Sequence, residues 1–231
     1  MRISTGSSIF DSFLEGGYET EVITSICGPG GSGKTTICML EAIEIASRNK
    51  KVLYIDTEGS FSLERLKQLT QDHEEILEKI IFLRPTSFKE QKNTFLKLRK
   101  LVDNKIGIII VDTISMFYRL ELGKDSPQET NRELGRQLCY LTEIARKKKL
   151  PILIANQVYA DFKNKNRVNI VGGDLLKYSS KCIIELQNLK AGNRRAVLRK
   201  HRSIKEEKHI LFKIVEKGIE PFKEKRGFRF F

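Results

Sequence analysis

Residues 22–36 read VITSICGPGGSGKTT, and this stretch decides the fold. An apolar run at 22–27 leads into the glycine-rich loop 28–35, and a helix-like stretch follows at 34–48. The order strand, loop, helix is the context in which the pattern G-x-x-x-x-G-K-[ST] indicates a phosphate-binding loop. Backbone N–H groups of such a loop wrap around a β-phosphate, and the helix N-terminus adds partial positive charge. A chance match is the alternative, and the surrounding elements argue against it.

Each side chain of this loop has an expected role. Lys34 is expected to reach the β- and γ-phosphate oxygens, Thr35 to ligate Mg²⁺, and Thr36 to contact the α-phosphate. Backbone contacts of the loop with the nucleotide are expected from Gly28, Gly30, Gly31, Ser32 and Gly33.

Two carboxylates follow other predicted strands. Asp112 ends the most apolar run, and Glu58 lies two residues beyond the run at 52–56. A carboxylate at the C-terminal tip of a parallel strand faces the ligand crevice. Asp112 therefore suits the water shell of Mg²⁺, and Glu58 suits polarisation of an attacking water. The alternatives are a turn-capping aspartate and a solvated loop carboxylate.

The order of apolar runs predicts the fold class. Strands are expected at 22–27, 52–56, 80–83, 106–112, 151–156, 182–186, 196–200 and 210–215, and helices at 34–48, 62–71, 87–103 and 127–149. Alternation of strand and helix implies a mostly parallel central sheet with helices on both faces. Beyond residue 180 the connections shorten, which predicts antiparallel strands at the C-terminal end. We expect one domain over 1–231.

Charge is distributed unevenly along the 231 residues. Of 42 Lys and Arg and 29 Asp and Glu in the chain, residues 160–231 hold 19 and 8. A polyanion such as nucleic acid would be attracted to such a region, and a solvated basic surface is the alternative. No apolar run approaches the roughly 20 residues of a membrane span, and no secretory signal is recognisable. We therefore expect a cytoplasmic protein without a membrane partner.

Five segments carry a resemblance to a known family. They are ISTGSSIFDSFLEGGYETEVITSICGPGGSGKTT (3–36), YIDTEGSFSLERL (54–66), IIIVDTISMFYR (108–119), ILIANQV (152–158) and GGDLLKYSSKCIIEL (172–186). In this order they resemble the RecA-like ATPase core of archaeal RadA and the eukaryotic recombinases. Nothing resembling the helix-hairpin-helix domain or polymerisation arm of those recombinases is recognisable. The chain therefore looks most like the short archaeal RadA paralogues of the RadB type.

The resemblance implies ATP and Mg²⁺ as ligands and assigns further roles. It makes Glu58 the catalytic glutamate and Gln157 a γ-phosphate sensor, both acting with Lys34, and it makes Arg65 an adenine contact. It also places a first DNA loop within 118–131 and a second at 158–172.

The second of these loops has the composition of a single-strand binding surface. Its expected DNA contacts are Tyr159, Phe162, Lys163, Lys165 and Arg167. Basic groups neutralise phosphates while aromatic rings stack on exposed bases. A mobile charged surface loop is the alternative.

The basic run 199–202 has two open interpretations. Lys200 and Arg202 resemble the Lys-x-Arg element with which RecA-like subunits reach a neighbour's nucleotide, which would require a homo-oligomer. The same residues, with Arg194, Arg195 and Arg199, could instead form a DNA-binding patch.

The resemblance favours one function and leaves others open. It implies an ATP- and DNA-binding accessory protein of DNA repair and homologous recombination, with weak ATPase activity and no strand exchange. Single-stranded or branched DNA and other recombination proteins would be its partners. The alternatives are an ATP-driven strand-exchange recombinase and a RecA-like ATPase motor of another pathway.

Overall fold

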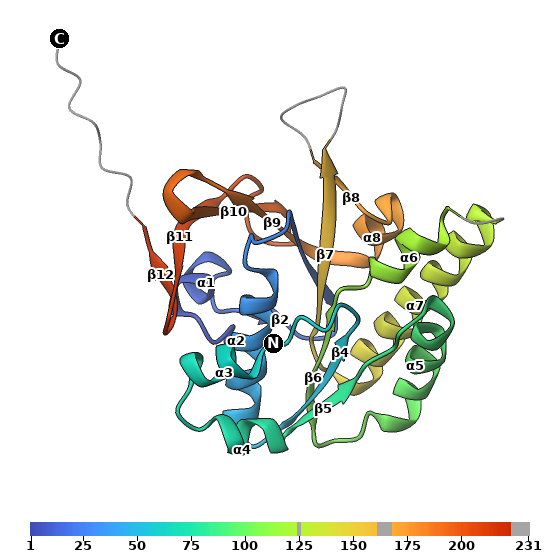
Figure 1. Ribbon diagram of the computed structural model, residues 1–231, viewed down its shortest axis with the longest axis horizontal. Coiled ribbons are helices and arrows are strands. Elements are labelled where there is room, and N and C mark those ends of the chain that lie inside the picture. Colours follow the sequence, from blue (N-terminus) through green and yellow to red (C-terminus); the bar gives the residue numbers. More distant parts are fainter. Residues whose placement is uncertain (124–125, 161–167, 223–231) are drawn as a thin grey trace, which may run out of the picture.

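The computed structural model describes residues 1–123, 126–160 and 168–222, and one large sheet runs through it (Figure 1). Along the chain the strands are β1 (Arg2–Ile3), β2 (Tyr18–Glu19), β3 (Ile23–Gly28), β4 (Lys51–Asp56), β5 (Ile80–Leu83), β6 (Ile106–Asp112), β7 (Ile152–Ala160), β8 (Val168–Ile170), β9 (Ser180–Asn188), β10 (Asn193–Lys200), β11 (His209–Val215) and β12 (Gly218–Pro221). The helices are α1 (Ser8–Phe13), α2 (Lys34–Ser47), α3 (Leu63–Leu69), α4 (His73–Glu78), α5 (Phe88–Leu101), α6 (Met116–Glu121), α7 (Pro127–Lys148), α8 (Gly173–Ser179) and the 3₁₀ turn η1 (Lys190–Gly192).

The sheet changes from parallel to antiparallel, as the sequence predicts. Its order is β12-β11-β10-β9-β3-β7-β6-β4-β5, and β8 pairs with β7. The strands β9, β3, β7, β6, β4 and β5 are parallel to one another, whereas β10, β11 and β12 each pair antiparallel with their neighbours. Because β3, β7, β6 and β4 are parallel, their C-terminal ends meet at one edge, where a ligand crevice is expected.

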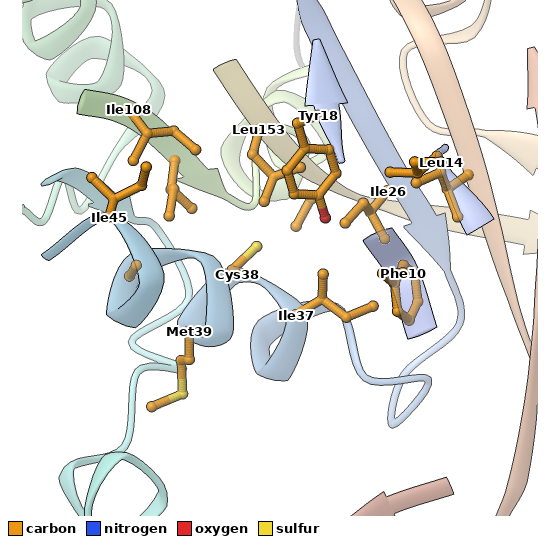
Figure 2. Close-up of a cluster of buried hydrophobic side chains, with 14 of the residues drawn as sticks. Phe10, Leu14, Tyr18, Ile26, Ile37, Cys38, Met39, Ile45, Ile108 and Leu153 are labelled. Atoms are coloured by element: carbon orange, nitrogen blue, oxygen red, sulfur yellow. The ribbon is translucent and has the colours of Figure 1, made fainter. Parts of the chain in front are cut away.

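Helices cover both faces of this sheet and bury two apolar cores. One core lies between the sheet and α1 and α2, and Figure 2 shows part of it around Phe10, Ile37 and Met39. The other lies beneath α5 and α7, where Leu134 and Leu138 of α7 are buried at the helical spacing seen in the sequence. The strand β6 is buried between the two cores, which explains its continuous apolar run.

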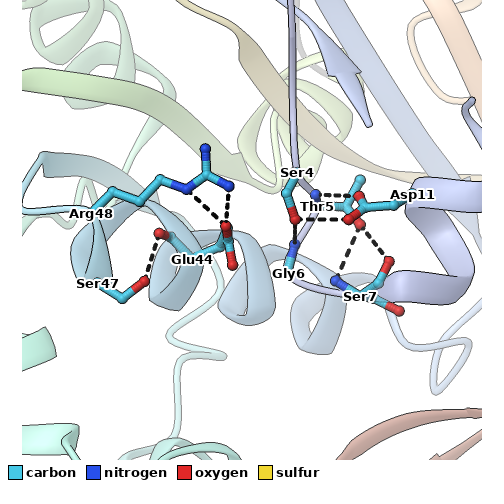
Figure 3. A network of polar contacts seen from close by, with 8 residues as sticks. All are labelled: Ser4, Thr5, Gly6, Ser7, Asp11, Glu44, Ser47 and Arg48. Carbon is cyan, nitrogen blue, oxygen red and sulfur yellow. Dashed lines mark hydrogen bonds and ion pairs between the residues drawn. The ribbon is translucent and has the colours of Figure 1, made fainter. Parts of the chain in front are cut away.

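A polar network fixes the segment before α1 against the first turn of that helix (Figure 3). Asp11 accepts hydrogen bonds from the Ser4 hydroxyl at 2.8 Å and the Thr5 backbone N–H at 2.6 Å. Gly6 adopts φ +71°, and a Cβ there would come within 2.4 Å of the Leu40 carbonyl oxygen. Only glycine fits this close approach to α2, the helix that follows the phosphate-binding loop.

Several short elements were absent from the sequence prediction. These are β1, β2, β8 and β12 and the helices α1, α4, α6 and α8. Two to seven residues give too little periodicity to be recognised, and tertiary contacts stabilise such elements. β7 extends to Ala160 instead of ending near residue 156, because Val158–Ala160 pairs with β8.

Glu41 of α2 is fully buried, and neither of its carboxylate oxygens has a hydrogen-bond partner among the described residues. Burial raises its pKa well above the ordinary value of 4.5, and the nearby charges of Glu44 and Asp11 add to the rise. Above pH 4.5 the unfolded chain therefore releases a proton that the folded chain keeps, so stability falls as pH rises.

Replacing Glu41 with glutamine is expected to remove this pH dependence. Between pH 4.5 and the raised pKa of Glu41, the variant should gain stability over the wild type by up to about 1.4 kcal/mol per pH unit. Urea unfolding at several pH values measures the difference, with the exposed Glu74→Gln as control. A stability difference that stayed constant with pH would contradict the buried neutral carboxyl.

In the part of the chain that the structure describes, no helix is both long and apolar enough to traverse a bilayer.

Candidate nucleotide-binding site

A pocket of about 500 Å³ opens at the C-terminal ends of β3, β4, β6 and β7. It is lined by Gly28, Pro29, Gly30, Gly31, Gly33, Lys34, Thr35, Thr36, Glu58, Asp112, Thr113, Arg119, Gln157, Val158 and Ile214. Residues from the glycine loop, the two carboxylate positions and the end of β7 therefore meet in one place. Ile214 of β11 reaches the same pocket from the antiparallel side of the sheet.

The glycine loop is shaped by close backbone approaches. Gly31 and Gly33 have φ of +69° and +103°, which favour glycine. A Cβ on Gly28 would lie 2.6 Å from the Ser32 hydroxyl, and one on Gly33 would lie 2.5 Å from Ile214. The buried Ser32 hydroxyl has no hydrogen-bond partner among the described residues. Glycine at 28 and 33 therefore lets the loop pack closely against Ser32 and Ile214.

Lys34 begins α2 with its side chain folded back onto the loop. Its ammonium donates to the carbonyl oxygens of Gly28 and Pro29, at 2.9 Å each. Burial lowers the pKa of Lys34, and the charges of Asp112 and Glu58 oppose the shift. A cation held this way is available to an anionic ligand that competes with the two carbonyls.

Asp112 lies at the tip of β6 within a cluster of hydroxyl groups. One oxygen, Oδ2, accepts from Tyr54 at 3.0 Å and from Ser60 at 3.1 Å, and Ser60 is 3.3 Å from the Thr35 hydroxyl. The other oxygen, Oδ1, is buried without a described partner. Burial raises the pKa of Asp112, and hydrogen bonds from Thr35, Tyr54 and Ser60 oppose the rise. The site therefore combines a free carboxylate oxygen with the hydroxyl of Thr35.

Glu58 is linked to Gln157 across the pocket. Its Oε1 accepts from the Gln157 amide at 2.6 Å and from the Thr113 hydroxyl at 2.8 Å. Arg119 in turn donates to the amide oxygen of Gln157 at 2.9 Å. The carboxylate, the amide and the guanidinium thus form one chain of hydrogen bonds along the pocket wall.

Arg65 lies outside the set of pocket-lining residues. Its guanidinium donates to the carbonyl oxygens of Val215 and Glu216, in the turn after Ile214. It is therefore next to an element that lines the pocket, and its contact with adenine stays a prediction.

The expected DNA residues fall into two groups. Phe162, Lys163, Lys165 and Arg167 lie outside the described residues. Tyr159 is at the end of β7 and is 54% exposed. Within the expected loop 158–172, residues 158–160 and 168–170 are paired strand rather than loop. The expected first loop, 118–131, is likewise helical at both ends, in α6 and α7.

A second hollow, of about 880 Å³, adjoins Tyr159. Its lining includes Tyr118, Arg119, Tyr159, Leu175 and Tyr178. Tyr178 is 77% exposed. Arg119 lines both this hollow and the pocket of the glycine loop, so the two adjoin at this side chain.

Lys200 and Arg202 lie at the opposite end of the sheet from the glycine loop. Lys200 is paired with Ile183 near the start of β9, and Arg194 with Asn188 at its end. Lys200 lies six positions beyond Arg194 in the strand, a span of about 20 Å. Lys200 donates to the Lys177 carbonyl at 2.5 Å, and Arg202 forms an ion pair with Glu19 at 2.8 Å. Any contact with a nucleotide would therefore have to involve a neighbouring subunit.

The residues of the alternative basic patch are spread along the whole of β10. Arg194 contacts the glycine loop at one end of β10, whereas Lys200 lies at the other. Arg199 between them is bound by two carboxylates, Glu185 at 2.6 Å and Glu207 at 2.6 Å.

Sequence reasoning missed several residues of the site. Tyr54, Ser60 and Thr113 surround the two carboxylates, and Arg119 and Arg194 approach from other elements. Ser60 and Thr113 could have been suspected, because each lies within two residues of a carboxylate already chosen. Nothing in the sequence places Arg194 beside the loop.

Comparisons with known proteins agree with this geometry. The Rad51 family model matches residues 1–222. The DNA repair and recombination protein RadB of Methanobrevibacter smithii is 42% identical over 226 residues, covering 94% of this chain and 95% of that protein. RadB of Thermococcus sibiricus is 39% identical over 223 residues, covering 94% of each.

A solved structure supports the same family assignment. The crystal structure of the RadB recombinase superposes with a TM-score of 0.82 at 37% identity, covering 96% of this chain and all of that one. With its RecA-like sheet and the glycine loop at the sheet edge, the chain belongs to the Rad51 family and, within it, to the RadB group of DNA repair and recombination proteins.

Proposed function

We propose that this chain binds ATP with Mg²⁺ in the pocket of the glycine loop and hydrolyses it slowly. The observation that carries the proposal is the convergence of Lys34, Asp112 and Glu58 on one pocket at the edge of a parallel sheet. A cation, a metal-directed carboxylate and a candidate general base are the groups that phosphoryl transfer to water requires.

The residues around Asp112 fit a magnesium ion. Mg²⁺ prefers oxygen ligands and keeps several of its waters. The buried Oδ1 of Asp112 has no described partner, and the Thr35 hydroxyl lies in the same cluster. Thr35 would ligate the ion directly and Asp112 would hold its water shell. When bound, the ion would neutralise charge on the phosphate oxygens.

The link between Glu58 and Gln157 supports slow turnover. Gln157 uses its amide N–H on Glu58 and its amide oxygen on Arg119. Before Gln157 can contact a γ-phosphate, both hydrogen bonds have to be exchanged. Hydrolysis would then depend on a rearrangement at the end of β7, the strand that leads into the expected second DNA loop.

The tyrosine-lined hollow supports binding of single-stranded or branched DNA. Exposed Tyr159 and Tyr178 offer rings for base stacking, and the excess of basic residues after residue 160 favours a polyanion. We place the protein as an accessory factor that acts with other recombination proteins and does not itself exchange strands. Self-association would bring Lys200 and Arg202 to a neighbour's nucleotide.

A paired assay tests this proposal. ATP hydrolysis is measured with and without single-stranded DNA, and strand exchange is measured with the same preparation. Nucleotide binding with low turnover and no joint molecules is the expected outcome. Efficient strand exchange would instead establish the full recombinase, and absence of ATP binding would overturn the proposed site.

Replacing Tyr159 with alanine is expected to weaken single-strand binding by about 1–3 kcal/mol while leaving the salt dependence unchanged, because a stacked ring carries no charge. Fluorescence anisotropy across a salt series measures both quantities. Tyr140→Ala is the control, since that ring packs on Arg99 instead. Wild-type affinity in Tyr159→Ala would move stacking to another ring.

Removing the expected phosphate contacts should change the salt dependence of single-strand binding, unlike removal of a stacked ring. The combined variant Lys163→Ala, Lys165→Ala, Arg167→Ala should lower affinity for any single strand and flatten the salt dependence by about 0.7 for each phosphate that is no longer neutralised. An unchanged slope and affinity would place the DNA-binding residues elsewhere.

A further inference from the structure

The four carbonyl groups from Gly28 to Gly31 of the glycine loop accept hydrogen bonds from side chains. Lys34 donates to the carbonyls of Gly28 and Pro29, both toward the base of the loop. The next two carbonyls, those of Gly30 and Gly31, belong to the exposed crown of the loop. Their donors come from the hairpin of β9 and β10, more than 150 residues later in the chain.

A cross-strand pair makes both contacts. Asn188, the last residue of β9, donates its side-chain amide to the Gly30 carbonyl at 3.1 Å. Arg194 donates through Nε and Nη2 to the Gly31 carbonyl at 3.2 and 3.0 Å. The two residues are directly opposite each other in the antiparallel register, so their side chains lie on the same face of the hairpin.

The guanidinium is itself held in place by the hairpin. Arg194 donates through Nη1 to the Gly192 carbonyl at 2.5 Å, and Leu189 N–H to Asn193 O at 2.9 Å closes the turn. An arginine fixed at three of its nitrogens keeps its orientation without a carboxylate partner. Its fixed position gives the crown carbonyls a rigid set of donors.

We infer that Asn188 and Arg194 are positioning residues that fix the crown of the glycine loop with its N–H groups directed at the phosphates of a bound nucleotide. Each crown carbonyl shares a peptide with the next N–H, that of Gly31 or Ser32. The Ser32 N–H makes a long hydrogen bond of 3.3 Å to the Pro29 carbonyl, which a phosphate oxygen would have to replace. A donor on the carbonyl polarises that peptide and strengthens its N–H as a donor to an anion. The inference rests on the proposed nucleotide binding and adds a second element of the fold to that site.

Arg194→Ala should weaken Mg-ADP binding about tenfold, as expected for removal of one charge-assisted hydrogen bond, and Asn188→Ala should weaken it about threefold. Because both act through the same loop, their effects in the double variant should not add. Arg194→Lys should recover part of the affinity, since an ammonium still reaches one carbonyl. Lys190→Ala is the control, because it removes the same charge from an exposed position in the same hairpin. This variant should bind Mg-ADP with the affinity of the wild type.

Calorimetric titration measures the affinity of each variant for Mg-ADP. Thermal melts without ligand check that each variant is folded. Wild-type affinity in Arg194→Ala and Asn188→Ala, or an equal loss in Lys190→Ala, overturns the inference. If Arg194→Ala does not fold, the Mg-ADP affinities of Asn188→Ala and Arg194→Lys test the inference instead.

Different binding results would show that the proposed nucleotide site itself is wrong. If the wild type binds no Mg-ADP, or Lys34→Ala binds it normally, nucleotide binding fails and the role of the hairpin falls with it. If Lys34→Ala loses binding while the Arg194 and Asn188 variants keep it, only the role of the hairpin is overturned.

Discussion

Lys34→Ala is expected to abolish tight binding of ATP and ADP, lowering affinity by roughly 100-fold or more. Among the described residues that line the pocket, Lys34 and Arg119 are the two cations, and Arg119 donates to Gln157. The Lys34 ammonium already bridges the carbonyls of Gly28 and Pro29, so it sits over the loop that would hold the phosphates. Its removal takes away the side-chain charge that opposes the β- and γ-phosphate oxygens.

Isothermal calorimetry with each nucleotide measures the effect, and the exposed Lys89→Ala provides a control of equal charge change. Unfolding curves without ligand separate loss of binding from loss of structure. Unchanged affinity in Lys34→Ala would show that the glycine loop does not bind phosphate.

Glu58→Gln is expected to keep nucleotide binding and to lower ATP turnover by about 10²- to 10⁴-fold. The amide oxygen of glutamine can still accept the hydrogen bonds from Thr113 and Gln157, so the pocket wall should keep its shape. An amide cannot accept a proton from the attacking water, which removes general base catalysis.

Single-turnover hydrolysis with enzyme in excess suits a slow ATPase, and Glu64→Gln on the exposed start of α3 is the control. Asp112→Asn tests the other carboxylate. Loss of hydrolysis in Asp112→Asn together with normal hydrolysis in Glu58→Gln would assign the general base to the carboxylate at the end of β6 instead of the one after β4.

The site could be predicted where its residues are close in sequence or carried by a known motif. The loop 28–35 follows its strand directly, and Asp112 ends an apolar run that can only be a buried strand. Parallel strands then bring their C-terminal ends together, so Glu58 and Asp112 had to approach the loop.

The secondary structure around the expected second DNA loop was predicted less well. The sequence predicts a loop over 158–172, yet residues 158–160 and 168–170 of this range form the pair of β7 and β8. Three-residue strands carry no readable alternation, and their pairing is decided by the partner strand. The basic residues at 194–202 lie far apart for a similar reason. An extended strand places the residues at its two ends at opposite ends of the sheet.

By itself, the sequence determined the order of the main strands and helices, the position of the glycine loop and the two carboxylates that line the same pocket, because local periodicity and short motifs encode all of these. The tertiary structure alone decided which distant groups meet. The Gln157 amide binds Glu58 across 99 residues of chain, and the Arg194 guanidinium binds the Gly31 carbonyl across 163. Such contacts arise from strand order and register, which are set by packing of the whole sheet.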